Sequence, residues 1–329
     1  MRKIVICISF IILSSSLFAQ LSEESSTWDN SDLRGKVKSV TESTYVIDSK
    51  GQRGTYAKQN VILQDEIIKN FDREGILIDQ RLVSYVGGES KKWHFTYNMQ
   101  RRLKEEAVYN DAGLYETVSY LYNGDKLIQK SWHKGKNKSL EKTWFYQYDT
   151  SGKLINEYWS DVSGNVAWKC IYTYDIKGNM TEKSWYVGNR MTTKWTCKYD
   201  INNNVVENAE YVNGLLREVS YNSYDNKNRL SEVNVFKNST LDMRKVYSYN
   251  KKGNLRMEWW YDSNGKQIHR RNFDYDKANK MLSSFTWGTN SELLDKIYWT
   301  YDNNANWVQR VEYEGHLPTY TIARNISYY

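Results

Sequence analysis

The stretch "YTYDIKGNM", Tyr172–Met180, decides the fold because the chain repeats it. Related phrases follow as "CKYDINNNV", Cys197–Val205, and "NSYDNKNRL", Asn222–Leu230. Aligned on the aspartate, or on the asparagine that replaces it, the copies lie 25 or 26 residues apart. Ten copies are centred on Asp72, Asn98, Asn123, Asp149, Asp175, Asp200, Asp225, Asn250, Asp276 and Asp302. A fixed period of this length indicates a repeat architecture.

The residues that flank the aspartate predict two strands. The residue before it is aromatic in every copy, and the residue two positions earlier is usually aromatic too, as in Tyr172 and Tyr174. This alternation has the period of a strand. Five residues after the aspartate comes an apolar residue such as Met180, which starts the return strand.

The centre of the phrase predicts a tight turn. An Asp or Asn side chain can accept a hydrogen bond from the backbone two residues on. Three residues later the chain needs positive φ, which glycine adopts freely and asparagine tolerates. The predicted turn residues are Asp149, Gly152, Asp175, Gly178, Asp200, Asn203, Asp225, Asn228, Asn250 and Gly253.

A second, looser turn falls in the middle of each repeat, as in "YVNG" at Tyr211. The fold class is therefore all-β: tandem β-hairpin repeats of about 25 residues form an antiparallel meander of about twenty strands. Twisted sheets rarely exceed ~10 strands without curling or splitting. We expect this one to curl into a spiral or barrel-like shell, with the aromatic positions and the apolar return positions lining its inside.

The N-terminus predicts export. Residues 1–19 have the basic start, apolar run and small-residue exit of a signal peptide, with cleavage after Ala19. Residues 20–56 form a polar segment and a strand that caps the first edge of the sheet, and residues 57–329 form the repeat domain. We expect a periplasmic, outer-surface or secreted protein without a membrane span, because no later stretch has the ~20 apolar residues that a span needs.

Charge and composition weaken several functional classes. The net charge is +7, or +5 without Arg2 and Lys3, and the signs are interspersed, which favours a solvated surface over a nucleic-acid site. The four histidines, at positions 94, 133, 269 and 316, have no zinc spacing, and no nucleophile or nucleotide motif occurs. The turns lack the ladder of carboxylates found in calcium loops. We expect no enzyme activity, no metal and no cofactor.

The two cysteines outside the signal peptide are Cys170 and Cys197. They occupy the same face of equivalent strands one repeat apart. With a strand between them, their Cα atoms are at least ~9.5 Å apart, whereas a disulfide needs less than ~7 Å. Two buried free thiols are therefore favoured.

A possible binding site lies where the copies differ. By period two, the residues four before the aspartate and ten after it face outward. These positions hold the candidate ligand-binding residues Phe145, Trp159, Trp185, Trp260 and Tyr298. They predict a strip that stacks against sugars of a glycan. The alternative is that this face packs on another turn of the spiral.

The phrases "YTYDIKGNM", "YQYDTSGKL" and "YSYNKKGNL" resemble the tyrosine-aspartate (YD) repeats of RHS proteins, from Phe71 to the C-terminus. In large members of that family such strips wind into a hollow shell around a toxic domain. The chain has one proline and no proline-rich segment of the kind that ends those shells. With a longer unit and two hairpin turns per repeat, the chain resembles a stand-alone binding or structural member of that family.

Two functions follow from this sequence. The first is a non-catalytic exported repeat protein that binds a polysaccharide or a cell-surface protein. The second is a small RHS-like shell that encloses or chaperones a polypeptide such as a toxin. A wide interior lined by aromatics favours the second function, and a filled interior with aromatics outside favours the first.

Overall fold

The computed structural model describes residues 33–48 and 60–329, so the predicted signal peptide lies outside the described residues. The described part contains 22 β-strands and no helix. The strands are β1 (Val37–Asp48), β2 (Asn60–Phe71), β3 (Leu77–Ser84), β4 (Lys91–Tyr97), β5 (Leu103–Asn110), β6 (Gly113–Asn123), β7 (Lys126–Lys134), β8 (Ser139–Tyr148), β9 (Leu154–Asp161), β10 (Val166–Tyr174), β11 (Met180–Val187), β12 (Arg190–Tyr199), β13 (Val205–Val212), β14 (Leu215–Tyr224), β15 (Leu230–Lys237), β16 (Thr240–Tyr249), β17 (Leu255–Asp262), β18 (Gln267–Tyr275), β19 (Met281–Trp287), β20 (Leu293–Tyr301), β21 (Trp307–Glu314) and β22 (Leu317–Tyr328).

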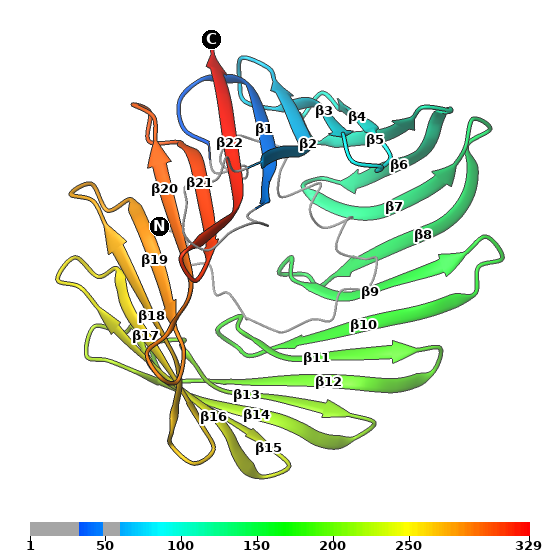
Figure 1. Ribbon diagram of the computed structural model, residues 1–329. Helices are drawn as coiled ribbons and strands as arrows, with labels where there is room; N and C mark the ends of the chain where they lie inside the picture. The colour runs from blue at the N-terminus through cyan, green and yellow to red at the C-terminus, as the bar shows by residue number, and fades with distance from the viewer. Residues whose placement is uncertain (1–32, 49–59) are drawn as a thin grey trace.

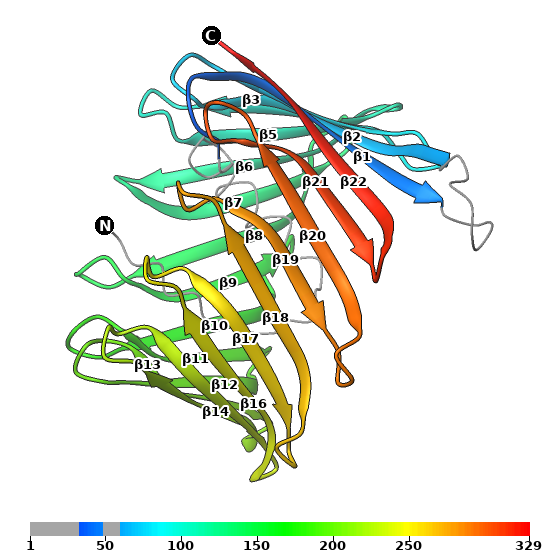
Figure 2. The same cartoon turned by 60° about the vertical axis from the view of Figure 1, so that its left-hand side comes forward.

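The strands form one closed sheet. Each pairs antiparallel with the next along the chain, and β1 pairs with both β2 and β22. Figure 1 shows the resulting ring, and Figure 2 shows the same wall from the side. The predicted all-β meander that curls into a barrel-like shell is confirmed, with closure into a barrel rather than an open spiral.

Strand β1 is the segment expected to cap the first edge. It does cover β2, and its other edge pairs with β22 from Val37–Tyr328 to Val46–Tyr320. The seam between β1 and β22 is reinforced by a Ser39–Ser327 hydroxyl contact of 2.6 Å and an Arg324–Glu42 ion pair of 2.8 Å. Because a closed sheet has no free edge, the pairing hazard of an edge strand is removed.

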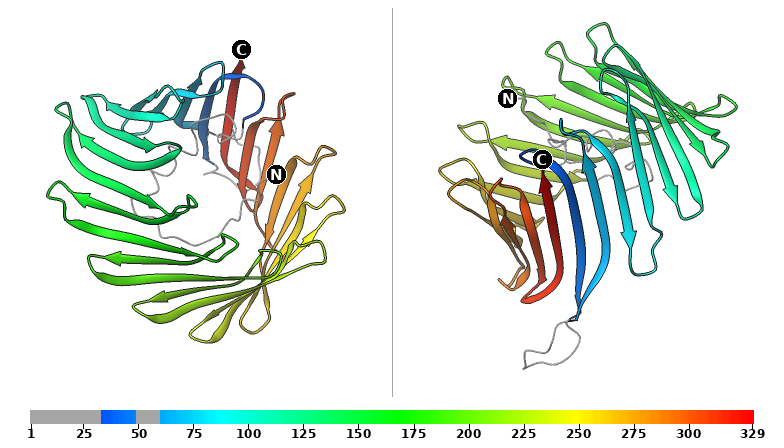
Figure 3. Two further views of the ribbon diagram at one scale, coloured as in Figure 1. Left: turned by 180° about the vertical axis from the view of Figure 1, so that it is seen from behind. Right: turned by 90° about the horizontal axis from the view of Figure 1, so that it is seen from above.

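The aspartate turns lie at one end of the barrel, which we call the aspartate rim. In the turn at Asp200, the carboxylate accepts hydrogen bonds from the backbone N–H groups of Asn202 and Asn204. Asn203 takes a φ of 63°, and Gly178 takes 89° at the same place one repeat earlier. Arg101 and Ala305 also have positive φ although they break the glycine–asparagine rule. The views from behind and from above in Figure 3 show the turns at the two ends of the wall.

A β-bulge follows the aspartate turn in all ten copies, and the one between β10 and β11 is typical. Tyr174 lies opposite Met180 and Thr173 opposite Glu182, so Thr181 is an extra residue on the return strand. A bulge places two residues opposite one and shifts the alternation of faces. It therefore decides which side chains of β11 share a face with the tyrosines of β10.

We define two faces of the wall by cross-strand partners. The tyrosine face carries the aromatic residues before each aspartate and the apolar residues that start the return strands; the other side is the opposite face. Near the aspartate rim the tyrosine face includes a buried cluster: Leu33, Val37, Val40, Phe71, Leu77, Phe95, Leu103, Tyr120 and Leu127.

Most of the wall is a single layer. Strands β16, β17 and β18 contain no buried residue on either face. A sheet that packs against a second layer buries the residues of one face. Among the described residues, this part of the sheet therefore has no second layer that covers either face.

Candidate functional site: a tryptophan belt on the tyrosine face

Six consecutive strands, β7 to β12, each place one tryptophan on the tyrosine face. The residues of this tryptophan belt are Trp132, Trp144, Trp159, Trp168, Trp185 and Trp195. Trp144 and Trp168 both lie directly opposite Trp159. Five strand spacings separate the first and the last member, about 24 Å. All six side chains are half-buried, so each keeps a surface for contact.

The belt is ordered by ring stacking and by lysines. Trp168 and Trp185 stack with centroids 4.5 Å apart and planes 17° from parallel. The Lys142 ammonium lies 5.4 Å from the Trp132 ring and 4.7 Å from the Trp159 ring. A cation over an aromatic face is attracted by the ring quadrupole. Lys142 on β8 therefore lies between the Trp132 ring of β7 and the Trp159 ring of β9.

Acidic partners complete the belt. The Trp132 indole donates to Glu116 at 3.0 Å, and the Tyr172 hydroxyl donates to Glu157 at 2.6 Å. Burial, with the Glu157 charge beside it, raises the pKa of Tyr172, so that the phenol stays protonated. The belt thus combines aromatic rings with both signs of charge and a fixed hydrogen-bond donor.

The two cysteines near the belt are buried thiols. Cys170 and Cys197 are free and buried, which confirms the favoured alternative. Burial raises the pKa of the Cys170 thiol to about 11. The thiolate, which is the nucleophile, is therefore scarce at neutral pH.

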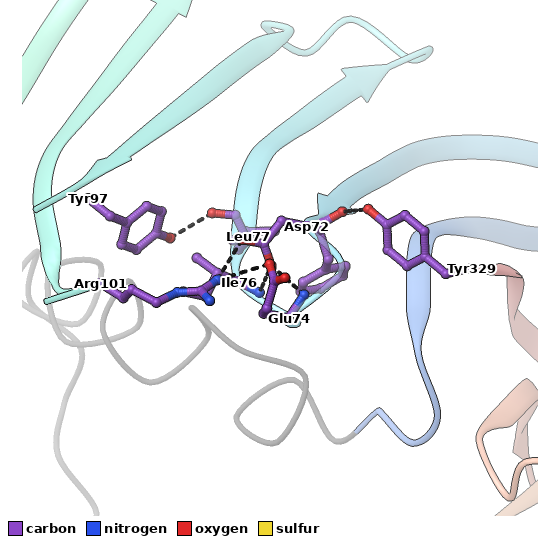
Figure 4. Close-up of polar contacts among 8 residues, drawn as sticks. Asp72, Glu74, Ile76, Leu77, Tyr97, Arg101 and Tyr329 are labelled. Carbon is purple, nitrogen blue, oxygen red and sulfur yellow. Dashed lines mark hydrogen bonds and ion pairs between the residues drawn. The ribbon is translucent and has the colours of Figure 1, made fainter. Parts of the chain in front are cut away.

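In seven repeats the tyrosine before the aspartate or asparagine clamps its repeat to the previous one. The Tyr199 hydroxyl donates to the Met180 carbonyl at 2.7 Å, and Figure 4 shows Tyr97 making the equivalent bond to Leu77 at 2.6 Å. In several repeats a cation from the previous turn also covers the ring, as Lys153 covers Tyr174 at 5.3 Å. The sequence pattern alone did not predict this clamp. Its signal is the basic residue directly before the apolar residue that starts the return strand, as in Lys153–Leu154.

The prediction that Phe145, Trp159, Trp185, Trp260 and Tyr298 share one outward face is wrong. Trp185 lies opposite Cys170, and Trp260 lies opposite Lys245, both on the tyrosine face. Counting alternate residues from Met180 places Trp185 on the outward face. The bulge residue Thr181 adds one position on the return strand, so Trp185 lies on the tyrosine face instead. Trp159 and Trp185 are on the same face as each other, two strands apart.

Phe145 and Tyr298 lie on the opposite face. Phe145 stacks on Tyr158 at 5.0 Å, and Tyr298 makes edge contacts with Phe285 at 5.8 Å and Tyr313 at 5.7 Å. These edge-on rings do not form a flat platform. The predicted strip is thus divided between two faces, and its tryptophans belong to the larger belt.

The remaining chemistry is sparse in the part of the chain that the structure describes. There, no group of three or more His, Cys, Asp or Glu side chains is placed to hold a metal ion. Across the same residues, no helix is long and apolar enough to cross a membrane. What the belt offers is a surface for contact.

No protein-family model and no curated protein matches the sequence. Among solved structures, the chain is similar to a chain of the Photorhabdus luminescens Tc holotoxin pore, at 12% identity and a TM-score of 0.43, over 78% of this chain and 14% of that one. It is also similar to porin-like proteins from Bacteroides uniformis (9% identity, TM-score 0.32, covering 89% and 99%) and Bacteroides vulgatus (12%, 0.18, covering 89% and 98%). The chain spans only about a seventh of the first of these.

Proposed function

We propose that this protein is a non-catalytic, exported shell that encloses an extended segment of another polypeptide against its tryptophan belt. The observation that carries the proposal is the belt itself: six partly exposed tryptophans on adjacent strands of one face. Trp and Tyr dominate the energetics of protein interfaces because they bury a large area with few rotatable bonds.

The size of the ring supports an interior wide enough for a chain. Strands lie ~4.8 Å apart, so 22 of them make a circumference of about 105 Å and, for a round ring, a diameter of about 34 Å. Strand tilt widens a barrel further. Side chains on two facing walls occupy ~10 Å together, which leaves about 24 Å across. The side chains of the wall do not fill that width.

We infer that the tyrosine face is the concave one. Side chains on the concave side of a closed sheet converge and are crowded, whereas those on the convex side diverge. The large buried side chains Phe71 and Leu77 lie on the tyrosine face and are 1% exposed, whereas Leu121 on the opposite face is 53% exposed. The belt therefore faces the lumen.

The chemistry of the belt suits a polypeptide. Lys142 and Lys183 lie between the tryptophans, and Glu116 and Glu157 lie beside them, so the surface offers aromatic stacking with both signs of charge. A span of ~24 Å matches about seven residues of extended chain. A glycan strip on the outside has less support, because its predicted members are divided between the two faces.

The test compares two stacked aromatic pairs with similar centroid distances and interplanar angles. Trp168→Ala with Trp185→Ala removes the stacked pair of the belt, and Phe145→Ala with Tyr158→Ala removes the stacked pair of the opposite face. The probe is a fluorescein-labelled, reduced and carboxymethylated lactalbumin, followed by anisotropy. We expect the belt variant to bind at least tenfold more weakly and the opposite-face variant to bind within twofold of the parent.

Thermal unfolding of each variant checks that the barrel remains folded, and Trp168→Phe supplies a milder change if the alanine pair unfolds. Equal losses from the two pairs, or no binding by the parent, would contradict the proposal. Retention on insoluble peptidoglycan that depends on the belt, without polypeptide binding, would replace it with a glycan-binding function.

A further inference from the structure

Five successive turns of the aspartate rim differ from the others in the side chains that they expose. They connect β10 to β11, β12 to β13, β14 to β15, β16 to β17 and β18 to β19, and Figure 1 shows these strands side by side. The residue after the aspartate is isoleucine in the first two turns. Ile176 is 104% exposed and Ile201 is 87% exposed. The same position holds Met99, 96% exposed, in the Asn98 turn, and Thr150, Asn226 or Lys251 in other copies, so the turn itself does not need an apolar residue.

The next three turns are basic. They carry Lys227, Arg229, Lys251, Lys252, Lys277 and Lys280 against two carboxylates, Asp225 and Asp276. Asn250 replaces the aspartate of the middle turn, which removes a third carboxylate. Arg229 is paired with Asp225 at 2.5 Å. Lys227, Lys251 and Lys277 are exposed and have no ion pair among the described residues.

The other cationic turn of this rim is neutralised by its neighbours. Arg101 pairs with Asp72 at 2.7 Å and with Glu74 at 3.4 Å, as Figure 4 shows, and Arg102 pairs with Asp125. Two parts of the rim thus have excess arginine or lysine. Among the described residues, the arginines near Asn98 are paired, whereas Lys227, Lys251 and Lys277 are not.

Hydrogen bonds join the first of these turns to the second and the fourth to the fifth. The Lys177 ammonium donates to the Ile201 carbonyl at 3.3 Å, and the Asn179 amide donates to Asn203 at 3.1 Å. The Lys252 ammonium donates to the Lys277 carbonyl at 2.5 Å. An open depression of about 610 Å³ lies between the first two turns, lined in part by Asp175, Lys177 and Ile201. The turns of each pair are therefore held side by side.

We propose that the edge formed by these five turns docks the barrel onto the surface of a lipid bilayer that contains anionic headgroups. Interfacial membrane binding combines apolar side chains inserted at the headgroup boundary with lysines attracted to anionic lipid. Ile176 and Ile201 supply the first component, and the lysines of the three basic turns supply the second. A soluble polyanion would use the lysines but would gain nothing from two isoleucines at the tips of turns.

The test is flotation of the purified protein with vesicles of 30% phosphatidylglycerol in phosphatidylcholine, and with pure phosphatidylcholine. We expect binding to the anionic vesicles only, and weaker binding at higher salt because exposed charges are screened. Replacing Lys227, Lys251 and Lys277 with Gln should weaken binding by roughly a hundredfold, at about fivefold for each lysine. Ile176→Ser with Ile201→Ser should weaken it at least tenfold.

Matched controls lie at the other rim. Lys134, Lys136 and Lys266 are exposed there and are replaced with Gln, and Val162 and Leu215, 64% and 76% exposed, are replaced with Ser. These variants should bind as the parent does. No binding by the parent, or equal losses from control and edge variants, overturns the proposal. Binding of polyglutamate that needs the three lysines but not the two isoleucines also overturns it, in favour of an acidic polymer.

Discussion

At the residue scale, the repeated phrase is explained by hydrogen bonds within one turn and between neighbouring repeats. The turn was predictable, because the acceptor of Asp200 and its donors lie within four residues of each other. The tyrosine clamp was not, because the partner of the Tyr199 hydroxyl lies 19 residues earlier and comes close only when repeats pair side by side. The two-residue alternation of a strand shows which face a side chain occupies, but it does not show which group that side chain hydrogen-bonds to.

Removing one clamp hydroxyl should cost a measurable part of the stability. Tyr199→Phe leaves the ring in place and leaves the half-buried Met180 carbonyl without that donor. A typical intramolecular hydrogen bond contributes about 0.5–1.5 kcal/mol, and we expect a loss in that range. Urea unfolding followed by tryptophan fluorescence measures it. Tyr211→Phe, on the opposite face, is the control and should change the unfolding free energy by less than about 0.5 kcal/mol; an equal change would remove the special role of the clamp.

The turn aspartates predict a loss of stability in acid. Hydrogen bonds lower the pKa of Asp175, first from the Asn179 side chain, and that of Asp200, first from the Asn204 backbone. A group whose pKa is lower in the folded state adds stability above its unfolded value, about 3.9, and this contribution is lost as the pH falls through the folded pKa. Unfolding free energies should therefore be constant from pH 7 to 5 and fall below about pH 4.

Asp200→Asn tests the source of this acid sensitivity. Asn250 and Asn98 show that the turn forms with an amide, which accepts the same backbone hydrogen bonds without titrating. The variant should fold and should lose less stability between pH 5 and pH 3 than the parent does. An unchanged slope would mean that other carboxylates control the response.

At the element scale, the strands and turns were predictable, but the assignment of faces failed. The bulge residue, such as Thr181 or Arg256, comes directly after the residue that starts the return strand. A shift of one residue moves every later side chain of a strand to the other face. Nothing in the apolar pattern marks this extra residue, because the return strands carry charged and aromatic residues on both faces.

Deleting Thr181 tests the role of the bulge. With Thr181 removed, Glu182 follows Met180 directly, so regular alternation keeps Trp185 on the tyrosine face and keeps its stack with Trp168. We expect this variant to retain its near-UV circular dichroism spectrum and to lose at most about 2 kcal/mol of stability. Deleting Thr181 and Glu182 together would place Trp185 on the opposite face or force the strand to change its pairing, and should cost several kcal/mol. Chemical unfolding with near-UV circular dichroism measures both losses. A double deletion as mild as the single deletion would show that the bulge residue does not set the faces.

At the scale of the whole molecule, the repeat count predicted the number of strands closely, whereas closure could not be predicted. The hydroxyl contact across the seam joins residues 288 positions apart, and Ser39 lies outside the repeat register. A spiral and a ring have the same local hydrogen bonds in every repeat. They differ at one seam, where β1 supplies the edges for both β2 and β22.

Closure also controls what the interior can do. An open spiral would leave both end strands free to pair with other chains, while the ring encloses a lumen that, in our proposal, the tryptophan belt faces. The C-terminal residues hold the seam from both sides. The Tyr328 hydroxyl donates to Asp302, and the Tyr329 hydroxyl reaches across β1 to the Phe71 carbonyl at 2.5 Å, as Figure 4 shows. The proposed enclosure of a polypeptide depends on this seam.

The most direct test of the closed shell is a disulfide across the seam, in the variant Ser39→Cys with Ser327→Cys. The two residues are direct cross-strand partners with hydroxyls 2.6 Å apart. Such pairs have Cα separations of ~4.5–5.5 Å, within the ~4.4–6.8 Å of disulfides. After mild oxidation, peptide mapping should find residues 39 and 327 linked in the monomer, while Ser39→Cys with Ser248→Cys stays unlinked. If both cysteines at the seam remain free to alkylation in the folded protein, the sheet is an open spiral and the account of a closed shell is wrong.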